Sequence, residues 1–413
     1  MSERSVKSVI LFAPVKILLQ HSQQEWLGVL GANSLIYTDQ EGKALVLEKF
    51  PALSSSFQFY KNFNDSAVVE IDALFAAKRL GTKAVIALAE SDMLRVARIK
   101  DRLSEALTHY EDATMFYRDK FLMKQRLAQH GLRINPMAVV RSACEIHDFV
   151  ERYGYPVVVK PRDGRGSGGV QVLREYSALL EYLQAQACTT FHNLMIEKYI
   201  DAPLLNVNGL YIAGNPIIIS PVRSTITCLE FLDGQSLGLQ MLSEENPLHN
   251  ECVKLTRRVI EQALPRLGTM MFHLEIFVDG GDLVVCEIAC RLGGCSVNQE
   301  LTEAYGVNPR LALINAEKGG ESLSMSTLIR PLRLVGQLNI PPSSGKLTAF
   351  PKNIDLPFVR YCSVTANQDA DYAGMKLTNS EIVSAIVDGD SERSVSDNLA
   401  QLDAWFRSRC VWD

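Results

Sequence analysis

The alternation of hydrophobic and polar positions is clearest near the middle of the chain, between Met271 and Gly294. Two apolar runs there flank the tetrapeptide Asp279-Gly280-Gly281-Asp282. Two such runs joined by a short polar segment rich in glycine are typical of a β-hairpin. We therefore predict two antiparallel strands joined by a tight turn in this stretch.

Each predicted strand of the hairpin carries one carboxylate within a mostly apolar run. Because successive strand side chains point to opposite faces, Glu275 shares a face with His273. By the same alternation, Glu287 shares a face with Arg291. Buried carboxylates usually bind a cation or an arginine, and oxygen ligands suit Mg²⁺ that bridges nucleotide phosphates. The alternative is that both carboxylates face solvent, as most glutamates do, and the hairpin alone leaves both interpretations open.

Residues 1–108 have the pattern of a small α/β unit. Short apolar strands are expected at 8–12, 35–38 and 84–88, with helices at 71–80 and from Asp92 onward. No Gly-x-Gly-x-x-Gly motif follows the first strand, so dinucleotide binding is not expected here.

The next segment alternates helices and strands and contains two basic motifs. A helix is predicted over 114–131, and it carries Arg118-Asp119-Lys120. A capping box at Ser142 opens a second helix to Tyr153. A buried strand over 155–161 follows and ends with Lys160.

A glycine-rich loop follows that strand directly. It contains Gly164, Gly166, Ser167, Gly168 and Gly169. Glycines leave backbone N–H groups unshielded, so such a loop can surround phosphate oxygens and can also move. The loop is not a Walker A motif, because no Lys-Ser/Thr follows the glycines. A plain hairpin tip is the alternative, and the adjacent Lys160 favours phosphate binding.

The remaining elements continue this mixed pattern. Strands are expected at 193–200 and on both sides of Gly214-Asn215, and helices at 177–187, 251–264, 298–305 and 309–318. The last 85 or so residues read as β-rich, with strands at 334–340, 358–364 and 382–387 and a closing helix over 391–407. No chemical motif stands out in that last part.

Composition narrows the class of protein. The chain has 413 residues, of which 47% are hydrophobic and 22% charged, as in globular proteins of two or three domains. A net charge of −5 argues against a broad basic surface for nucleic acid, and no apolar run reaches the ~18 residues of a membrane span. Nine scattered cysteines, an odd number, favour a reducing compartment, so we expect a cytoplasmic protein without nucleic-acid or membrane partners.

Taken in order, these motifs resemble those of the ATP-grasp superfamily, in particular the carboxylate–amine ligases that include bacterial L-amino-acid (dipeptide) ligases. The resemblance covers roughly residues 1–310 and implies an α/β and α+β architecture, the ATP-grasp fold, with an antiparallel sheet in its large subdomain. It implies a pre-grasp α/β domain at 1–108 and a grasp core at 109–310, with a mobile lid at about 133–199. Residues 311–413 would complete the large subdomain.

The resemblance also assigns nucleotide-binding roles. Lys120 and Lys160 would contact the phosphates of ATP, and the loop from Gly164 to Gly169 would fold over them. The segment Glu197 to Ile200 resembles the hinge that holds adenine. Glu197 would accept a hydrogen bond from the adenine amino group, and the backbone of Lys198, Tyr199 and Ile200 would read the ring edge.

The metal and the reacting groups are assigned in the same way. Glu275 and Glu287 would hold Mg²⁺, and Arg291 would face the transferred phosphoryl group or a substrate carboxylate. Two positions depart from the family pattern. Ala289 stands where an asparagine ligand is usual, and Leu204-Leu205 stands where a polar ribose partner is usual.

Three features remain open between a functional and a structural role. His273 either takes a proton from an attacking amine or orients Glu275. Arg223 either binds a substrate carboxylate or lies on the surface. The Gly293-Gly294 pair either lets substrate approach the backbone or only ends the strand.

The resemblance implies a ligase that uses ATP and Mg²⁺ to join a carboxylate substrate to an amine, most simply amino acids or small peptides. The carboxylate would become an acyl phosphate, with Lys160 and Arg291 stabilising the transferred phosphoryl group, and the amine would then form an amide. Dipeptide or peptide-antibiotic assembly would be the role, and a homodimer is possible. The alternatives are a carboxylase-type or purine-type ATP-grasp enzyme, or a nucleotide-binding protein without catalysis.

Overall fold

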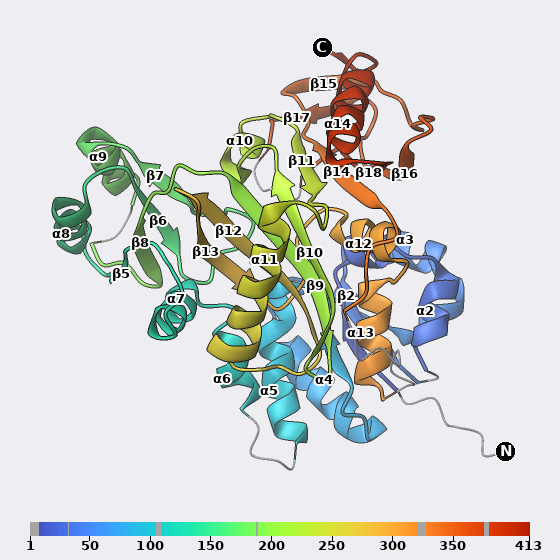
Figure 1. Cartoon of the computed structure of the whole chain (residues 1–413). Helices are drawn as coiled ribbons and strands as arrows, with labels where there is room; N and C mark the ends of the chain where they lie inside the picture. The colour runs from blue at the N-terminus through green and yellow to red at the C-terminus, as the bar shows by residue number, and fades with distance from the viewer. Residues whose placement is uncertain (1–7, 32, 105–108, 187–188, 320–327, 376–379) are drawn as a thin grey trace.

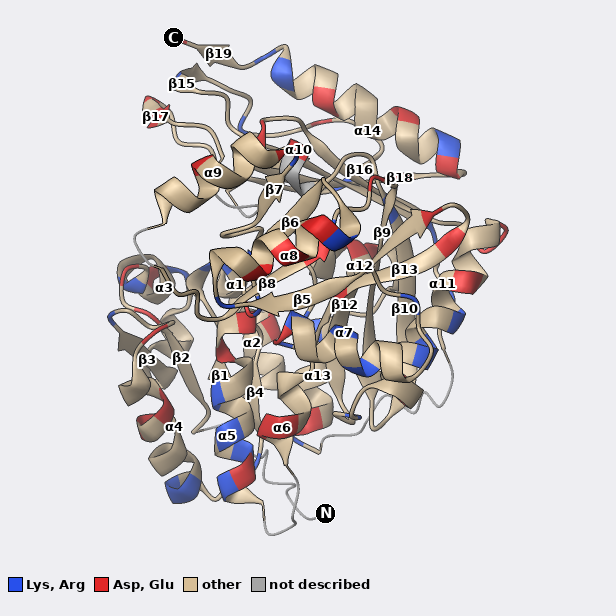
Figure 2. Cartoon of the chain, turned by 90° about the vertical axis from the view of Figure 1, so that its left-hand side faces the viewer, with Lys and Arg blue, Asp and Glu red and all other residues tan. Residues whose placement is uncertain are grey.

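Four β-sheets organise the chain in a computed structural model that describes residues 8–31, 33–104, 109–186, 189–319, 328–375 and 380–413 (Figure 1). Acidic and basic residues are interspersed along the ribbon in Figure 2. Within the described ranges, no helix combines the length and the apolar character that a bilayer crossing requires.

The first sheet is parallel, with strand order β3-β2-β1-β4. Its central strand β1 (Ile10–Phe12) is fully buried, as expected of a parallel strand covered by helices on both faces. The other strands are β2 (Leu35–Asp39), β3 (Phe57–Tyr60) and β4 (Val85–Ala87). The helices around them are α1 (Val15–Leu18), α2 (Gln23–Val29), α3 (Lys43–Lys49), η1 (Pro51–Ser56), α4 (Ala67–Leu80), η2 (Glu90–Asp92) and α5 (Met93–Leu103).

A small antiparallel sheet, with strand order β5-β8-β6-β7, projects from one side of the molecule (Figure 1). Its strands are β5 (Met137–Val140), β6 (Val157–Pro161), β7 (Gln171–Leu173) and β8 (Leu194–Lys198). The helices α8 (Ala143–Tyr153) and α9 (Tyr176–Ala185) cover it. The Ser142 side chain caps α8 by accepting from the Glu145 N–H, which is one half of the predicted capping box, while the Glu145 carboxylate accepts from the Arg141 N–H instead of the Ser142 N–H. The glycine-rich loop joins β6 to β7.

The large sheet has eight antiparallel strands in the order β13-β12-β9-β10-β11-β14-β18-β16. The predicted hairpin is confirmed as β12 (Met270–Asp279) and β13 (Asp282–Ala289). Glu275 pairs directly with Glu287, and a bulge follows, so that Ile276 pairs with Val285. The carboxylates therefore lie side by side on one face, because directly paired residues share a face.

Alternation along β9 (Leu204–Ile212) assigns the two faces of the large sheet. Val207 and Tyr211 pack with α11 (Pro247–Arg257) and the π-helical turn Arg258–Ala263. Leu210 and Ile212 pack on the opposite face with α12 (Val297–Tyr305) and α13 (Pro309–Glu317). Asn206 shares this second face, where the apolar packing gives way to polar side chains.

The C-terminal part extends the same large sheet. After β10 (Asn215–Ser224), α10 (Cys228–Leu232) and β11 (Leu237–Met241), the strands β14 (Leu334–Ile340), β18 (Val383–Gly389) and β16 (Val359–Val364) complete it. The predicted closing helix is α14 (Glu392–Arg407), which packs on β14 and β18. A third antiparallel sheet, β17-β15-β19, consists of β15 (Gly345–Ala349), β17 (Ala370–Tyr372) and β19 (Val411–Trp412).

The single helix predicted over 114–131 is wrong. The structure has α6 (Tyr110–Met115), a break, and then α7 (Lys120–Gln129). The Asp119 carboxylate accepts hydrogen bonds from the N–H groups of Phe121 and Leu122, both at 3.0 Å, and so starts a new helix. Lys120 is therefore the first residue of α7.

A buried ionic cluster joins α7 to the small sheet. The Glu197 carboxylate on β8 lies 2.5 Å from Lys160 Nζ on β6 and 2.5 Å from Lys124 Nζ on α7. Lys124 also donates to Asn135 Oδ1 at 2.7 Å. Burial alone would raise the pKa of Glu197, but Lys124 and Lys160 outweigh it and lower that pKa to about 2.

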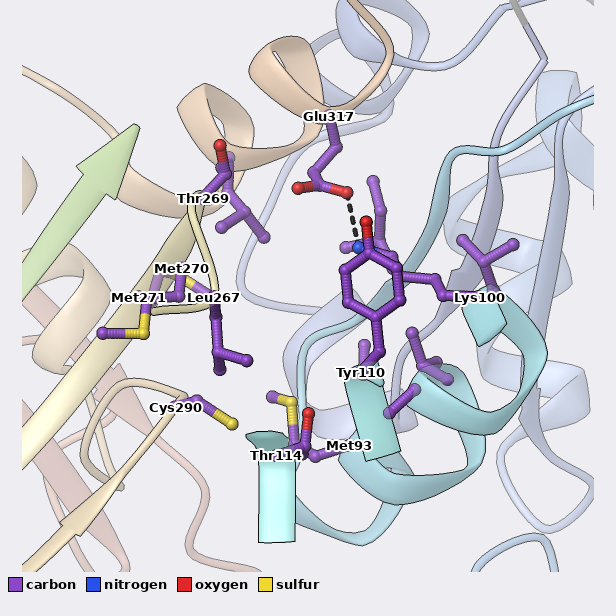
Figure 3. A pocket seen from close by; sticks show the side chains of 16 residues that line it. Met93, Lys100, Tyr110, Thr114, Leu267, Thr269, Met270, Met271, Cys290 and Glu317 are labelled. Atoms are coloured by element: carbon purple, nitrogen blue, oxygen red, sulfur yellow. Dashed lines mark hydrogen bonds and ion pairs between the residues drawn. The ribbon is translucent and has the colours of Figure 1, made fainter. Parts of the chain in front are cut away.

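The parallel sheet meets the large sheet across a small cavity of about 80 Å³. Figure 3 shows Lys100 of α5 paired with Glu317 of α13 at 2.6 Å, with the Cys290 sulfur on another side of the cavity. The remaining lining is largely apolar, so apolar burial and this ion pair both contribute to the contact at the cavity.

Gly209→Ala should destabilise the central strands of the large sheet. A Cβ at this position would lie 2.0 Å from the Ile218 carbonyl oxygen and 2.6 Å from the Phe272 ring. We expect the free energy of unfolding to fall by about 3 kcal/mol in urea denaturation, since the backbone must shift. Gly28→Ala, on the exposed side of α2 with open space around it, should instead add about 0.5–1 kcal/mol. Equal effects of the two substitutions would contradict this packing.

Glu197→Gln should leave two buried ammonium groups without a counter-charge and lower the free energy of unfolding by about 3–5 kcal/mol at pH 7. The pKa of Glu197 is about 2 in the folded chain against an ordinary 4.5. The stabilisation is therefore complete above pH 4.5 and is lost as the pH falls toward 2. Denaturation at a series of pH values checks this, because the difference between wild type and variant should shrink over that window.

Candidate active site

A cleft of about 260 Å³ lies between the small sheet and the large sheet. Most of the residues that the sequence singled out line it, although they come from distant parts of the chain. These are Lys120, Lys160, Gly164, Gly166, Ser167, Gly168, Glu197, Lys198, Tyr199, Ile200, His273, Glu275, Glu287, Arg291, Gly293 and Gly294.

Two predicted site residues are not among the described residues that line the cleft. Gly169 lies in the glycine-rich loop, where a Cβ would lie 3.0 Å from the Pro161 ring. Arg223 lies on β10 next to Ser224, and Ser224 is the residue that lines the cleft. Because neighbouring strand residues point to opposite faces, the structure does not bring Arg223 to the site.

Lys120 connects the glycine-rich loop to the hairpin. Its ammonium donates to the Gly164 carbonyl oxygen at 2.7 Å and lies 3.2 Å from Glu287 Oε2. Gly166 and Ser167 in the loop have φ angles of 57° and 59°, in the left-handed region, and both line the cleft. The loop and the lysine thus offer donors to an anion in the cleft.

The two hairpin carboxylates face this positive charge. Burial alone would raise the pKa of Glu287, but Lys120 and Lys160 outweigh it and lower the pKa to about 2. Glu287 is therefore anionic at neutral pH although it is mostly buried. Glu275 lies directly opposite it on β12.

These residues fit a magnesium ion that shares its coordination with phosphates. Mg²⁺ prefers oxygen ligands and is commonly held by one or two carboxylates together with phosphates and water. Within the described ranges, no group of three or more His, Cys, Asp or Glu side chains is arranged to hold a metal. The pair Glu275 and Glu287 therefore suits an ion that arrives with a nucleotide better than a metal enclosed by protein.

Arg291 has a partner that the sequence did not reveal. Its Nε donates to Glu90 Oε2 at 3.0 Å, and its second terminal nitrogen pairs with the same oxygen. Arg118 pairs with the other oxygen of Glu90. Burial alone would raise the pKa of Glu90, but Arg291 and Arg118 outweigh it and lower the pKa. The only signal for Glu90 was its place just after the parallel strand β4, at the carboxyl edge where such sheets bind ligands.

His273 is held in one orientation by Asn208, a second residue that sequence reasoning missed. Asn208 Oδ1 accepts from the Gly293 N–H at 3.2 Å and lies 2.9 Å from His273 Nδ1. The oxygen is an acceptor, so Nδ1 carries the proton, and Nε2 faces Glu275 Oε1 at 3.3 Å. A Cβ on Gly293 would lie 2.9 Å from His273 Nδ1, so glycine is required for this close approach.

Comparison with known proteins agrees with this geometry. A domain family described as "Carbamoyl-phosphate synthase L chain, ATP binding domain" matches residues 119–204, which include Lys120, Lys160, the loop and the hinge. The L-arginine-specific L-amino acid ligase of Bacillus subtilis is 22% identical over 273 residues, which span 64% of this chain and 64% of that ligase.

Solved structures match over nearly the whole chain. The L-amino acid ligase from Bacillus licheniformis has a TM-score of 0.73 at 20% identity and covers 98% of this chain and 99% of its own. The biotin carboxylase domain of the 2-oxoglutarate carboxylase from Hydrogenobacter thermophilus, solved with MgADP and bicarbonate, has a TM-score of 0.65 at 16% identity, covering 95% of this chain and 89% of its own. The chain therefore has the ATP-grasp fold of these structures, and its residues 119–204 match an ATP-binding domain.

Proposed function

We propose that the chain is an ATP-dependent carboxylate–amine ligase that forms an amide bond and releases ADP and phosphate. One observation carries this proposal: two lysines, two carboxylates and a glycine-rich loop from five separate elements converge on one cleft. The similarity to L-amino acid ligases supports amino acids or small peptides as substrates.

The hinge between the two sheets is proposed to hold adenine. The Lys198 N–H donates to the Pro136 carbonyl oxygen at 2.9 Å, and its carbonyl accepts from Asn135 Nδ2 at 2.8 Å. The Tyr199 N–H also donates to the Pro156 carbonyl oxygen, at 3.3 Å. The Tyr199 carbonyl and the backbone of Ile200 are therefore proposed to read the ring edge. Both oxygens of Glu197 already accept from lysines, so its predicted bond to the adenine amino group would use a remaining lone pair and stays a prediction.

Glu275 and Glu287 are proposed to hold Mg²⁺. When bound, this ion would neutralise phosphate charge and polarise the transferred phosphoryl group. Lys120 and Lys160 stand on the cleft wall with the carboxylates and would stabilise negative charge on the phosphate oxygens. His273 is fixed by Asn208 and lies beside Glu275, so an orienting role is proposed for it, with proton transfer to Nε2 as the alternative.

The reaction follows in two steps. A substrate carboxylate oxygen attacks the γ-phosphorus of ATP, the bond to the β-phosphate oxygen breaks, and an acyl phosphate and ADP form. The amine of the second substrate then attacks the acyl carbon, loses a proton, and expels phosphate to leave the amide. The glycine-rich loop would exclude water, which otherwise hydrolyses the acyl phosphate.

Removing either hairpin carboxylate should abolish ligation without unfolding the chain. Glu275→Gln and Glu287→Gln keep the size of the side chain but lose the charge, so we expect phosphate release to fall at least about 100-fold. Glu251→Gln, an exposed glutamate on α11, is the matched control and should retain wild-type turnover. Near wild-type ADP release by Glu275→Gln would refute the metal assignment.

The substrate requirement separates this proposal from its alternatives. ADP release should depend on amino acids and not on bicarbonate, and the product mass should equal the two substrates less one water. A matrix of amino-acid pairs, assayed for phosphate release and by mass spectrometry, makes the measurement. Release that requires bicarbonate would favour a carboxylase-type enzyme. ATP binding without turnover on any pair would favour a non-catalytic protein.

A further inference from the structure

The C-terminal strand β14 places two amide side chains, Gln337 and Asn339, at the wall of the cleft. Gln337 pairs with Leu239 of β11, which in turn pairs with Ser224 of β10, so these three residues share one face of the large sheet. This is the face that carries Glu275 and Asn206 further along the sheet. The same polar surface thus runs from the carboxylates to this amide pair.

The amide pair is buried, and part of its hydrogen-bonding capacity is unused. Gln337 Nε2 donates to Asn339 Oδ1 at 3.0 Å, and the Ser384 hydroxyl donates to the same oxygen at 2.7 Å. Gln337 Oε1 and Asn339 Nδ2 have no hydrogen-bond partner among the described residues, and both side chains are 0% exposed. Buried polar atoms are normally paired, so two unpaired atoms at a cavity wall indicate a ligand.

The unused capacity does not depend on how the two amides are oriented. As placed, the pair offers one acceptor, Gln337 Oε1, and one donor, Asn339 Nδ2. If both amides are turned over, Asn339 donates to Gln337, and one donor on Gln337 and one acceptor on Asn339 remain. Either way the pair presents one donor and one acceptor side by side.

The neighbours of the amide pair on β11 are apolar, because Gln337 pairs with Leu239 and Asn339 with Leu237. Leu237, Leu239 and Val297 form the neighbouring wall of the cleft. Glu275 lies four strands away in the sheet order, which is up to about 19 Å at the usual spacing of ~4.8 Å between strands. This end of the cleft therefore lies apart from the groups proposed to handle phosphate.

On the basis of the proposed ligase function, we propose that the amide pair binds the side chain of an amino-acid substrate. This side chain is uncharged and carries both a hydrogen-bond donor and an acceptor, as a primary carboxamide does. A carboxylate offers only acceptors and would leave Gln337 Oε1 unpaired. An ammonium offers only donors and would leave Asn339 Nδ2 unpaired. Each mismatch lowers affinity by roughly ten- to a hundredfold.

Calorimetric titration of amino acids into the full chain saturated with ADP and Mg²⁺ tests this without turnover. L-Glutamine should bind about tenfold or more tightly than L-glutamate, L-lysine and the apolar analogue L-methionine, which has a similar length. Methionine binding as tightly as glutamine would overturn the proposal and leave the amide pair as a contact within the sheet.

Two substitutions that keep the side-chain volume test whether the preference for glutamine depends on Gln337 and Asn339. Gln337→Met and Asn339→Leu should each lower the ratio of glutamine to methionine affinity about tenfold. Ser384→Ala is the matched control, because Ser384 bonds to Asn339 but is not among the described residues that line the cleft, and it should keep the ratio. ADP affinity and the melting temperature verify that each variant is folded, and either variant alone is sufficient for the test.

The outcomes separate this inference from the proposed function. If amino-acid pairs release phosphate but neither variant changes the glutamine preference, the amide-pair proposal fails and the ligase proposal stands. If glutamine binds selectively and the variants remove that selectivity, but no pair releases phosphate, the amide-pair site stands and the ligase proposal fails.

Discussion

The placement of two carboxylates directly opposite one another on neighbouring strands is the constraint on which the rest of this structure depends. Like charges in this position repel each other and destabilise a sheet. Glu275 and Glu287 nevertheless pair in register, and Lys120 lies 3.2 Å from Glu287. The arrangement is stable only because cations from other elements face the pair. The fold must therefore bring α7 and β6 over the hairpin.

In this structure, the cations that would meet phosphate are paired with carboxylates. Lys160 pairs with Glu197, Lys120 with Glu287, and Arg291 with Glu90. The site is thus electrically compensated before a nucleotide arrives. Because lysine and arginine have several donors, phosphate oxygens can add to these contacts without leaving any carboxylate buried and unpaired. This explains how so many charges remain buried between the two sheets at a tolerable cost.

Local signals in the sequence predicted the parts of the site that are contiguous in the chain. The turn Asp279–Asp282 identified the hairpin, and Lys160 with its glycines identified the loop. The sequence did not show that α7 restarts at Asp119, because apolar periodicity continues through a cap. Glu90 and the amide pair were missed for another reason: their partners lie about 200 residues away or on strands whose neighbours only the sheet order reveals. For Arg223 the sequence left two roles open, and only the strand register shows that its neighbour Ser224 is the residue on the cleft face.

The central claim is that four groups far apart in sequence, Lys120, Lys160, Glu275 and Glu287, bind one magnesium–triphosphate. A crystal structure of the chain with Mg²⁺ and a non-hydrolysable ATP analogue tests it most directly. The account predicts both lysines within hydrogen-bond distance of the phosphate oxygens and both carboxylates at about 2.1 Å from the metal. A nucleotide bound elsewhere, or a metal that neither carboxylate touches, would contradict it.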